Sequence, residues 1–233
     1  MTRAAQQAPE EATSHESLVE RYAAMSHTFD RRPVDRVLRV LDIVLALVLL
    51  VLTSPLQALC AVAVLLSGSR SALYRGLRVG RGGRVFEMVK FRTLRPDAEA
   101  RLGPYLGHEL TQLTAGEETQ VGRLLRGSKL DELPQLVNVL RGEMSIVGPR
   151  PIRPLFFEEL AQEIPAYWQR LVVPPGLAGF AQLRLTREMT WAEKLAHDFE
   201  YIADRSIGLY MSVVWQTAWL VLRRPAKRAR PGA

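Results

Sequence analysis

The chain has 233 residues, of which 48% are hydrophobic and 24% charged, a composition that excludes disorder throughout and a fibrous repeat. A single cysteine, Cys60, excludes an internal disulfide and a metal site built from several cysteines. The formal net charge of +7, taken alone, suggests nucleic acid or an anionic membrane surface as a partner.

The N-terminal segment, residues 1–32, is expected to be a flexible tail. Its first 30 residues carry a net charge of −3 and few large apolar side chains. They lack the basic start, apolar stretch and small-residue cleavage site of a signal peptide. We therefore expect a poorly ordered tail, with at most a short helix around residues 17–25.

Residues 33–69 are expected to form a membrane segment. No charged residue occurs between Ile43 and Ser69, and about 20 apolar residues suffice to cross a bilayer. Pro55 lies in the middle, where a proline removes a backbone donor and kinks or breaks a helix. The alternative interpretation is a buried core helix.

The charged residues around this segment suggest how it is placed. Basic residues favour the cytoplasmic side of a membrane, and here they flank both ends: Arg31, Arg32, Arg36, Arg39, Arg70, Arg75, Arg78, Arg81 and Arg84. We therefore predict a re-entrant helix hairpin that enters the membrane, breaks at Ser54-Pro55 and returns to the same side. Asp42, just inside the entry, is expected to pair with Arg39 or a later arginine.

The remaining sequence predicts a mainly α fold with a small β element, in which residues 70–206 form a cytosolic catalytic domain. Alternating apolar residues after a glycine turn predict a short strand at Val85–Phe91. The other expected elements are a helix beginning at Pro96 and running to Arg101, a loop at 103–122, and short helices at 155–163 and 167–172.

Residues 207–233 combine an apolar, aromatic-bearing stretch with a basic tail. The stretch from Ile207 to Leu222 is uncharged and contains Trp215 and Trp219. Five basic residues follow it, an arrangement typical of an amphipathic helix that lies in the membrane interface beside anionic headgroups. A packed core helix with a solvated tail is the alternative.

The densest chemical signal is the acidic pair Asp131-Glu132. Pro134 is tolerated in the first turn of a helix, so a helix is expected to start near Ser128 or Asp131. Two acids at the positive end of a helix, with Arg126 and Lys129 close in sequence, suit an anion together with a divalent cation. Simple N-capping by Asp131 is the alternative.

Two further stretches carry cations or rigid turns. In Gly148-Pro149-Arg150-Pro151 the prolines stiffen the backbone around Arg150, which suits bidentate recognition of a phosphate. An ordinary surface loop is the alternative for this stretch. The turn from Pro174 to Gln182 is a candidate binding loop, and Lys90 and Arg92 place two cations at the end of the predicted strand.

Together these motifs resemble the bacterial sugar transferase family, the monotopic phosphoglycosyl transferases that start glycoconjugate assembly on polyprenol phosphate. The resemblance extends in order from Pro33 to Arg224 and corresponds to the minimal catalytic form of the family. The stretches that carry it are Lys90-Phe-Arg-Thr-Leu94, Leu130-Asp-Glu-Leu-Pro-Gln-Leu136, Asn138-Val-Leu-Arg-Gly-Glu-Met-Ser-Ile-Val-Gly-Pro-Arg-Pro151 and Pro175-Gly-Leu-Ala-Gly179.

The resemblance implies a reaction in which a sugar-1-phosphate passes from a UDP-sugar to polyprenol phosphate and UMP is released. It implies Asp131 as the nucleophile that forms an aspartyl-phosphosugar intermediate, and Glu132 as the ligand of Mg²⁺. The expected substrate-binding residues are Lys90, Arg92, Arg126, Arg150, Pro151 and Gln182.

The same resemblance places the chain at the bacterial inner membrane, with the catalytic domain on the cytoplasmic face. The expected partners are a nucleotide sugar, polyprenol phosphate and membrane lipids, and the expected role is the start of exopolysaccharide, O-antigen or other glycoconjugate synthesis. A homodimer is left open. We expect no nucleic-acid partner, because the basic residues bracket apolar segments and do not form a basic strand with interleaved aromatic residues.

The chain departs from the family pattern at four places. Ala178 stands where threonine is common, Pro174 where arginine is common, and Gly76 where a glutamine precedes an Arg-x-Gly turn. Residues 184–186 replace a usual Asn-Gly-Arg. These changes affect expected sugar and nucleotide contacts and leave the acidic pair intact, so an enzyme is favoured over the alternative of an inactive membrane-bound scaffold.

Overall fold

A computed structural model describes residues 32–96, 98, 116–184 and 189–223 of the chain. These residues are mainly helical with two small sheets, which confirms the predicted fold class at that level. The predicted tail (apart from Arg32), most of the helix expected at 96–101, most of the loop at 103–122 and the basic tail after Arg223 lie outside the described residues.

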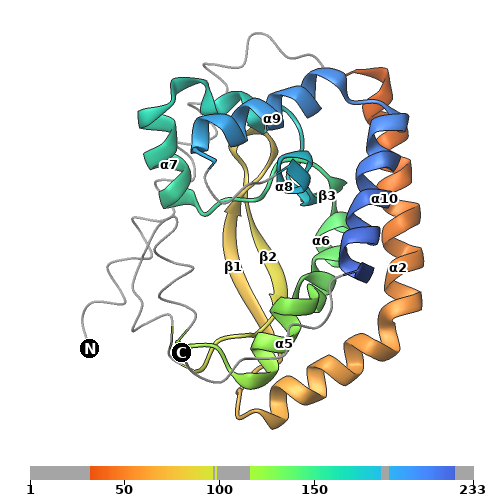
Figure 1. Cartoon of the computed structure of the whole chain (residues 1–233), viewed down its shortest axis with the longest axis vertical. Helices are drawn as coiled ribbons and strands as arrows, with labels where there is room; N and C mark the ends of the chain where they lie inside the picture. The colour runs from red at the N-terminus through yellow and green to blue at the C-terminus, as the bar shows by residue number, and fades with distance from the viewer. Residues whose placement is uncertain (1–31, 97, 99–115, 185–188, 224–233) are drawn as a thin grey trace.

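The elements follow one another in the order shown in Figure 1. They are α2 (Pro33–Leu66), β1 (Leu73–Val79), the 3₁₀ turn η1 (Arg81–Gly83), β2 (Val85–Phe91), α5 (Gln120–Ser128), the 3₁₀ helix η2 (Leu130–Gln135), α6 (Leu136–Arg141), β3 (Ser145–Val147), α7 (Pro154–Glu163), the 3₁₀ helix η3 (Pro165–Val172), β4 (Gly176–Ala178), α8 (Phe180–Arg184), α9 (Trp191–Asp204) and α10 (Ile207–Arg223).

Helix α2 is long enough and apolar enough to cross a membrane, and it bends part-way along its length (Figure 1). Pro55 lies inside it and cannot donate to the preceding turn. The hydroxyls of Thr53 and Ser54 donate to the carbonyls of Leu49 and Val51 at 2.6 and 2.8 Å, a pattern that often bends helices. The predicted break at Ser54-Pro55 is therefore a bend within one continuous helix.

The first half of α2 is fastened to the rest of the protein by Asp42. Its Oδ1 accepts three hydrogen bonds, from the Ser145 hydroxyl at 2.9 Å, the Ile146 backbone N–H at 2.8 Å and the Tyr210 hydroxyl at 2.8 Å. The expectation that Asp42 pairs with an arginine is wrong, because the carboxylate faces β3 and α10, which supply neutral donors. Arg39 instead donates to the carbonyls of Val139 and Leu140, at the end of α6.

Helix α10 lies beside the upper half of α2 (Figure 1). One face of it is core, because Tyr210 and Val213 are fully buried. The other face exposes Met211, Trp215 and Trp219. The helix thus combines both interpretations of its sequence: it packs against the fold and presents an apolar, aromatic surface.

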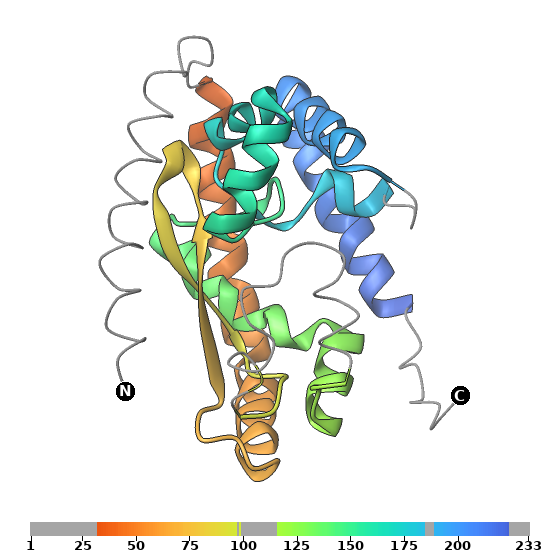
Figure 2. The ribbon, with the colours of Figure 1, turned by 90° about the vertical axis from the view of Figure 1, so that its left-hand side faces the viewer.

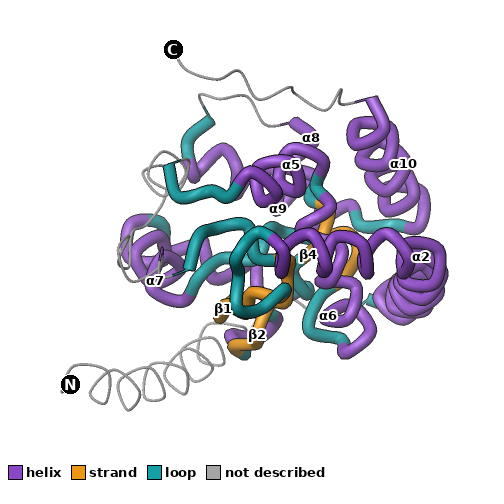
Figure 3. Tube along the Cα trace, turned by 90° about the horizontal axis from the view of Figure 1, so that it is seen from below, coloured by secondary structure: helices purple, strands orange, loops and turns teal. Residues whose placement is uncertain are grey.

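Strands β1 and β2 form an antiparallel ribbon that runs alongside α2 (Figure 2). The structure confirms the predicted strand at Val85–Phe91 and adds β1, whose arginines concealed its alternation in the sequence. Seen from below, the ribbon lies between α7 on one side and α2 with α6 on the other (Figure 3). Helices α7 and α9 gather at one end of the ribbon and α5 lies at the other (Figures 1 and 2).

A second, parallel pair joins β3 to β4. Just after β3, Gly148 lies against Gly176 of β4, where a Cβ added to Gly176 would fall 2.0 Å from the Gly148 nitrogen. Only glycine fits this approach, which fixes the Gly148–Pro151 turn next to the start of β4.

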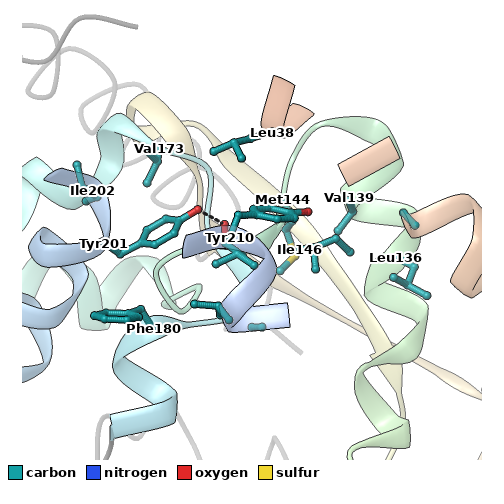
Figure 4. Close-up of a cluster of buried hydrophobic side chains, with 14 of the residues drawn as sticks. Leu38, Leu136, Val139, Met144, Ile146, Val173, Phe180, Tyr201, Ile202 and Tyr210 are labelled. Atoms are coloured by element: carbon teal, nitrogen blue, oxygen red, sulfur yellow. Dashed lines mark hydrogen bonds between the residues drawn. The ribbon is translucent and has the colours of Figure 1, made fainter. Parts of the chain in front are cut away.

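The main core links these elements around Tyr201 and Tyr210 (Figure 4). The Tyr201 hydroxyl donates to the Val147 carbonyl at 3.1 Å, so α9 also holds the end of β3. The aliphatic members of this core come from α2, α6, β3 and neighbouring turns, and include Leu38, Leu136, Val139, Met144 and Ile146. The short strand β3 is therefore enclosed by helices that are far apart in the sequence.

Replacing Asp42 tests how strongly this fastening stabilises the fold. Asp42→Ala leaves three buried donors without an acceptor, and each costs about 1–3 kcal/mol, so we expect a large fall in the apparent Tm. Asp42→Asn retains a carbonyl oxygen at the same place, so its apparent Tm should fall much less. Thermal unfolding of both variants in detergent measures this difference, and equal losses would contradict it.

Candidate active site

The acidic pair lies in a tight turn between two helices. Helix α5 ends at Ser128, and Lys129 adopts a left-handed conformation (φ 64°) from which η2 begins. Asp131 and Glu132 occupy the first turn of η2, which confirms the expected helix start near Asp131. The alternative start at Ser128 is wrong, because Ser128 ends α5 and its hydroxyl donates to the Leu124 carbonyl at 2.8 Å.

Asp131 is buried and incompletely paired. Its side chain is 4% exposed, and its Oδ1 is enclosed without a hydrogen-bond partner. Burial and the charge of Glu132 raise its pKa, while Lys90, Lys129 and Arg126 act in the opposite direction. A buried carboxylate oxygen without a partner is costly, and it marks a point where a reacting group or a cation fits.

Lys90, in the neighbouring sheet, acts on this carboxylate through its charge. It lies in β2, which packs against η2, and its ammonium group stands 5.1 Å from the centre of the Tyr74 ring. Burial, followed by the charges of Arg126, Arg78 and Arg150, lowers the pKa of Lys90 to about 8, and only Asp131 opposes this shift. Asp131, Arg126 and Arg150, three residues that the sequence analysis singled out, thus lie close enough for their charges to act on Lys90.

Arg126 and Glu132 each have a partner next to the site. Arg126 forms a salt bridge of 2.5 Å with Glu118, and Glu132 one of 3.2 Å with Lys129. Among the residues that the structure describes, no three of the His, Cys, Asp and Glu side chains converge on one point. Asp131 and Glu132 nevertheless fit Mg²⁺, which is commonly held by one or two carboxylates together with substrate oxygens.

The turn that carries Arg150 and Pro151 is held by its backbone. The Gly176 N–H donates to the Pro149 carbonyl at 2.8 Å, and Arg170 donates to the Arg150 carbonyl at 3.0 Å. Arg170 is itself fixed by two hydrogen bonds to Asp198, of 2.8 and 3.1 Å. The Arg150 side chain is exposed, so the turn presents a cation from a rigid backbone as predicted.

Arg92 and Gln182 are less directly connected to this centre. The Arg92 Nε and the Gln182 Nε2 are both buried without a hydrogen-bond partner. Within the described part of the chain, neither side chain is hydrogen-bonded to Asp131. Their substrate contacts stay predictions.

Three arginine and aspartate side chains of this region were missed as site residues. Arg170 and Asp198 act behind the Arg150 turn, and their roles depend on contacts between elements far apart in the sequence. Arg78 was grouped with the basic flank of the membrane segment, yet it is buried in β1 and its charge acts on Lys90. Its place in an Arg-x-Gly turn was the one signal that could have separated it from that flank.

A profile of the family described as "Bacterial sugar transferase" matches residues 34–224. The chain belongs to the bacterial sugar transferase family. The match covers all the residues of the site, from Lys90 to Gln182.

Curated relatives from this family are similar over most of the chain. A UDP-glucose:undecaprenyl-phosphate glucose-1-phosphate transferase of Caulobacter vibrioides is 39% identical over 194 residues, which are 80% of this chain and 70% of that protein. The exopolysaccharide production protein ExoY of Rhizobium meliloti is 34% identical over 189 residues, 77% of this chain and 82% of that protein.

Other sugar transferases that match are considerably longer than this chain. A UDP-N-acetylgalactosamine-undecaprenyl-phosphate N-acetylgalactosaminephosphotransferase of Aeromonas hydrophila is 35% identical over 187 residues. These residues are 79% of this chain and 43% of that protein, so the chain spans less than half of that relative.

Proposed function

We propose that this bacterial sugar transferase moves a sugar-1-phosphate from a UDP-sugar to a membrane polyprenol phosphate and releases UMP, as the first step of glycan assembly. The activities after which several relatives are named support the reaction class. The observation that carries the assignment to a site is the buried, unpartnered Oδ1 of Asp131 amid Lys90, Lys129 and Arg126.

The proposed chemistry has two displacements at one phosphorus atom. A carboxylate oxygen of Asp131 bonds to the phosphorus that carries the sugar, and the bond from that phosphorus to the bridging oxygen breaks, so UMP leaves with the electron pair. An oxygen of polyprenol phosphate then bonds to the same phosphorus and Asp131 leaves. Each step exchanges one P–O bond for another, and no oxidant, reductant or net proton is required.

The surrounding cations make this attack feasible. A carboxylate and a diphosphate repel each other, and fixed positive charges in a buried site offset that repulsion. Lys90, Arg126 and Arg150 supply such charges from β2, α5 and the Gly148–Pro151 turn. We propose further contacts of Arg92, Pro151 and Gln182 with the donor.

Glu132, together with Asp131, is the proposed holder of Mg²⁺. When bound, the ion supplies Lewis-acid neutralisation of phosphate charge. The salt bridge of 3.2 Å from Lys129 orients Glu132 beside Asp131 in the same turn.

A UMP-release assay over a panel of UDP-sugars, with polyprenol phosphate and detergent-purified protein, tests this proposal. We expect release with at least one donor, its loss in EDTA, and its recovery with added Mg²⁺. Asp131→Asn removes the nucleophile, so turnover should fall on the order of 10³-fold or more. The exposed Asp204→Asn is a matched control and should keep wild-type turnover. Near-normal turnover of Asp131→Asn would rule out the covalent mechanism.

The pH dependence of the first displacement tests the electrostatics. Lys90 loses its charge as the pH rises through about 8, so kcat/KM for UMP release should fall above that pH. Since burial raises the pKa of Asp131, the acidic limb of this pH profile should lie at a higher pH than the ordinary pKa of an aspartate. The assay omits polyprenol phosphate and follows a single burst of UMP. The ionisation of the acceptor then cannot contribute to the pH profile.

Lys90→Arg is the matched variant, because arginine keeps its charge at this pH. The basic limb of the pH profile should move to higher pH in this variant, even if the maximal rate falls. An unchanged limb would show that another group titrates there.

We also propose that α2 enters the membrane and returns, with α10 in the interface and the catalytic elements on the cytoplasmic face. The bend around Pro55 and the exposed apolar residues of α2 and α10 support this arrangement. Reporter tags at both chain ends should then be detected in the cytoplasm. A C-terminal tag detected outside would favour a spanning helix.

A further inference from the structure

One face of the β1–β2 ribbon brings three residues of β1 into line with Lys90. Tyr74, Gly76 and Arg78 alternate along β1, so their side-chain positions share one face. Tyr74 is paired directly with Lys90 across the ribbon, which places Lys90 on that face as well. This row therefore leads from Lys90, beside Asp131, to Arg78 near the end of the strand.

The Tyr74 side chain lies along the strand over Gly76. A Cβ added to Gly76 would fall 2.4 Å from the Tyr74 hydroxyl oxygen and 2.8 Å from two ring carbons. The ring thus fills the space that a side chain at position 76 would need. In this position Tyr74 hydrogen-bonds to Arg78, and the Lys90 ammonium stands 5.1 Å from the ring centre.

Arg78 is a buried cation surrounded by other cations. Its side chain donates to the Leu77 carbonyl at 2.6 Å and bonds to Tyr74, both of which are uncharged groups. The charges of Arg153, Arg150 and Lys90 are close enough to interact unfavourably with it. Within the described ranges, no carboxylate forms a salt bridge with Arg78, which leaves its charge uncompensated.

Arg170 shows how this fold treats a buried arginine with a structural role. Arg170 is 5% exposed and Arg78 is 8% exposed. Arg170 donates two hydrogen bonds to the carboxylate of Asp198, which compensates its charge. Among the described residues, no carboxylate does this for Arg78. Burying an unpaired charge is costly, so a guanidinium kept in that state fits an anion that arrives from outside.

We propose that Arg78 binds a phosphate of the nucleotide-sugar donor, and that Tyr74, lying across Gly76, positions its guanidinium for this contact. This inference rests on the proposed function and adds two residues to the same site. The diphosphate supplies the missing negative charge between Arg78, Arg150 and Lys90. Tyr74 acts through Arg78 and Lys90 and does not itself touch the reacting atoms.

Binding of UDP to the full chain in detergent tests the role of Arg78, with isothermal titration for affinity and thermal unfolding for stability. Arg78→Gln should weaken UDP binding roughly 10- to 100-fold, the range of a lost charge-assisted hydrogen bond. Because it removes an uncompensated charge, its apparent Tm without ligand should equal or exceed that of the wild type. Arg75→Gln, an exposed arginine on the same strand that pairs with Glu87, is the matched control and should keep its affinity. Unchanged affinity in Arg78→Gln overturns the proposal.

Two milder variants test the positioning role and keep the proposal falsifiable if Arg78→Gln does not fold. Tyr74→Phe removes only the hydroxyl, and Gly76→Ala displaces the ring. Each variant should raise KM for the UDP-sugar several-fold, with a smaller change in kcat. The two effects should not add in the double variant, because each substitution alone already frees the Arg78 side chain from Tyr74. Wild-type KM in both variants overturns the positioning role.

The outcomes separate this inference from the proposed function. If the wild type binds UDP but releases no UMP from any UDP-sugar, the transferase proposal fails and UDP affinity alone decides the role of Arg78. If the wild type turns over and Arg78→Gln keeps both affinity and kcat/KM, only the inference about Arg78 fails. A wild type that neither binds UDP nor releases UMP contradicts both.

Discussion

The architecture depends on a single carboxylate oxygen. Oδ1 of Asp42 accepts donors from β3 and α10, and so joins an apolar helix to the two parts of the fold that surround the Gly148–Pro151 turn. An acid in an otherwise apolar helix is expensive unless its hydrogen-bonding needs are met. Here three donors meet them at once, which makes the attachment specific in position as well as strong.

The site shows the opposite balance of charge. Around Asp131 and Lys90 the protein gathers cations from β1, β2, α5 and the turn after β3. Within the described part of the chain, Arg78 among them forms no salt bridge with a carboxylate. Such an arrangement disfavours the empty protein and favours a state in which a dianionic ligand is present. Arg170 with Asp198 demonstrates that the same fold compensates a buried guanidinium fully where no ligand is expected.

The sequence predicted the mainly helical fold and the strand at Val85–Phe91, because these features depend on local patterns. Motif order also singled out Asp131, Arg126 and Arg150, whose charges act on Lys90 in the structure, but their roles in the site stay predictions. The partners of Asp42 could not be foreseen, since Ser145 and Tyr210 are more than 100 residues away in the chain. Strand β1 was hidden by its arginines, and Arg78 was assigned to the membrane flank because burial leaves no mark on charge patterning. Pro55 predicted a disturbance of α2, but not that the helix continues through it as one element.

The bent helix α2 also contacts two different parts of the structure that surrounds the catalytic centre. Before the bend, Asp42 holds α2 to β3; after it, Cys60 and Val64 pack against Phe91 of β2 and Leu125 of α5. Between these anchors most side chains face outward. Helix α2 thus links β3, which leads to Arg150, with β2, which carries Lys90. A change in the bend of α2 would therefore shift these two cations relative to each other.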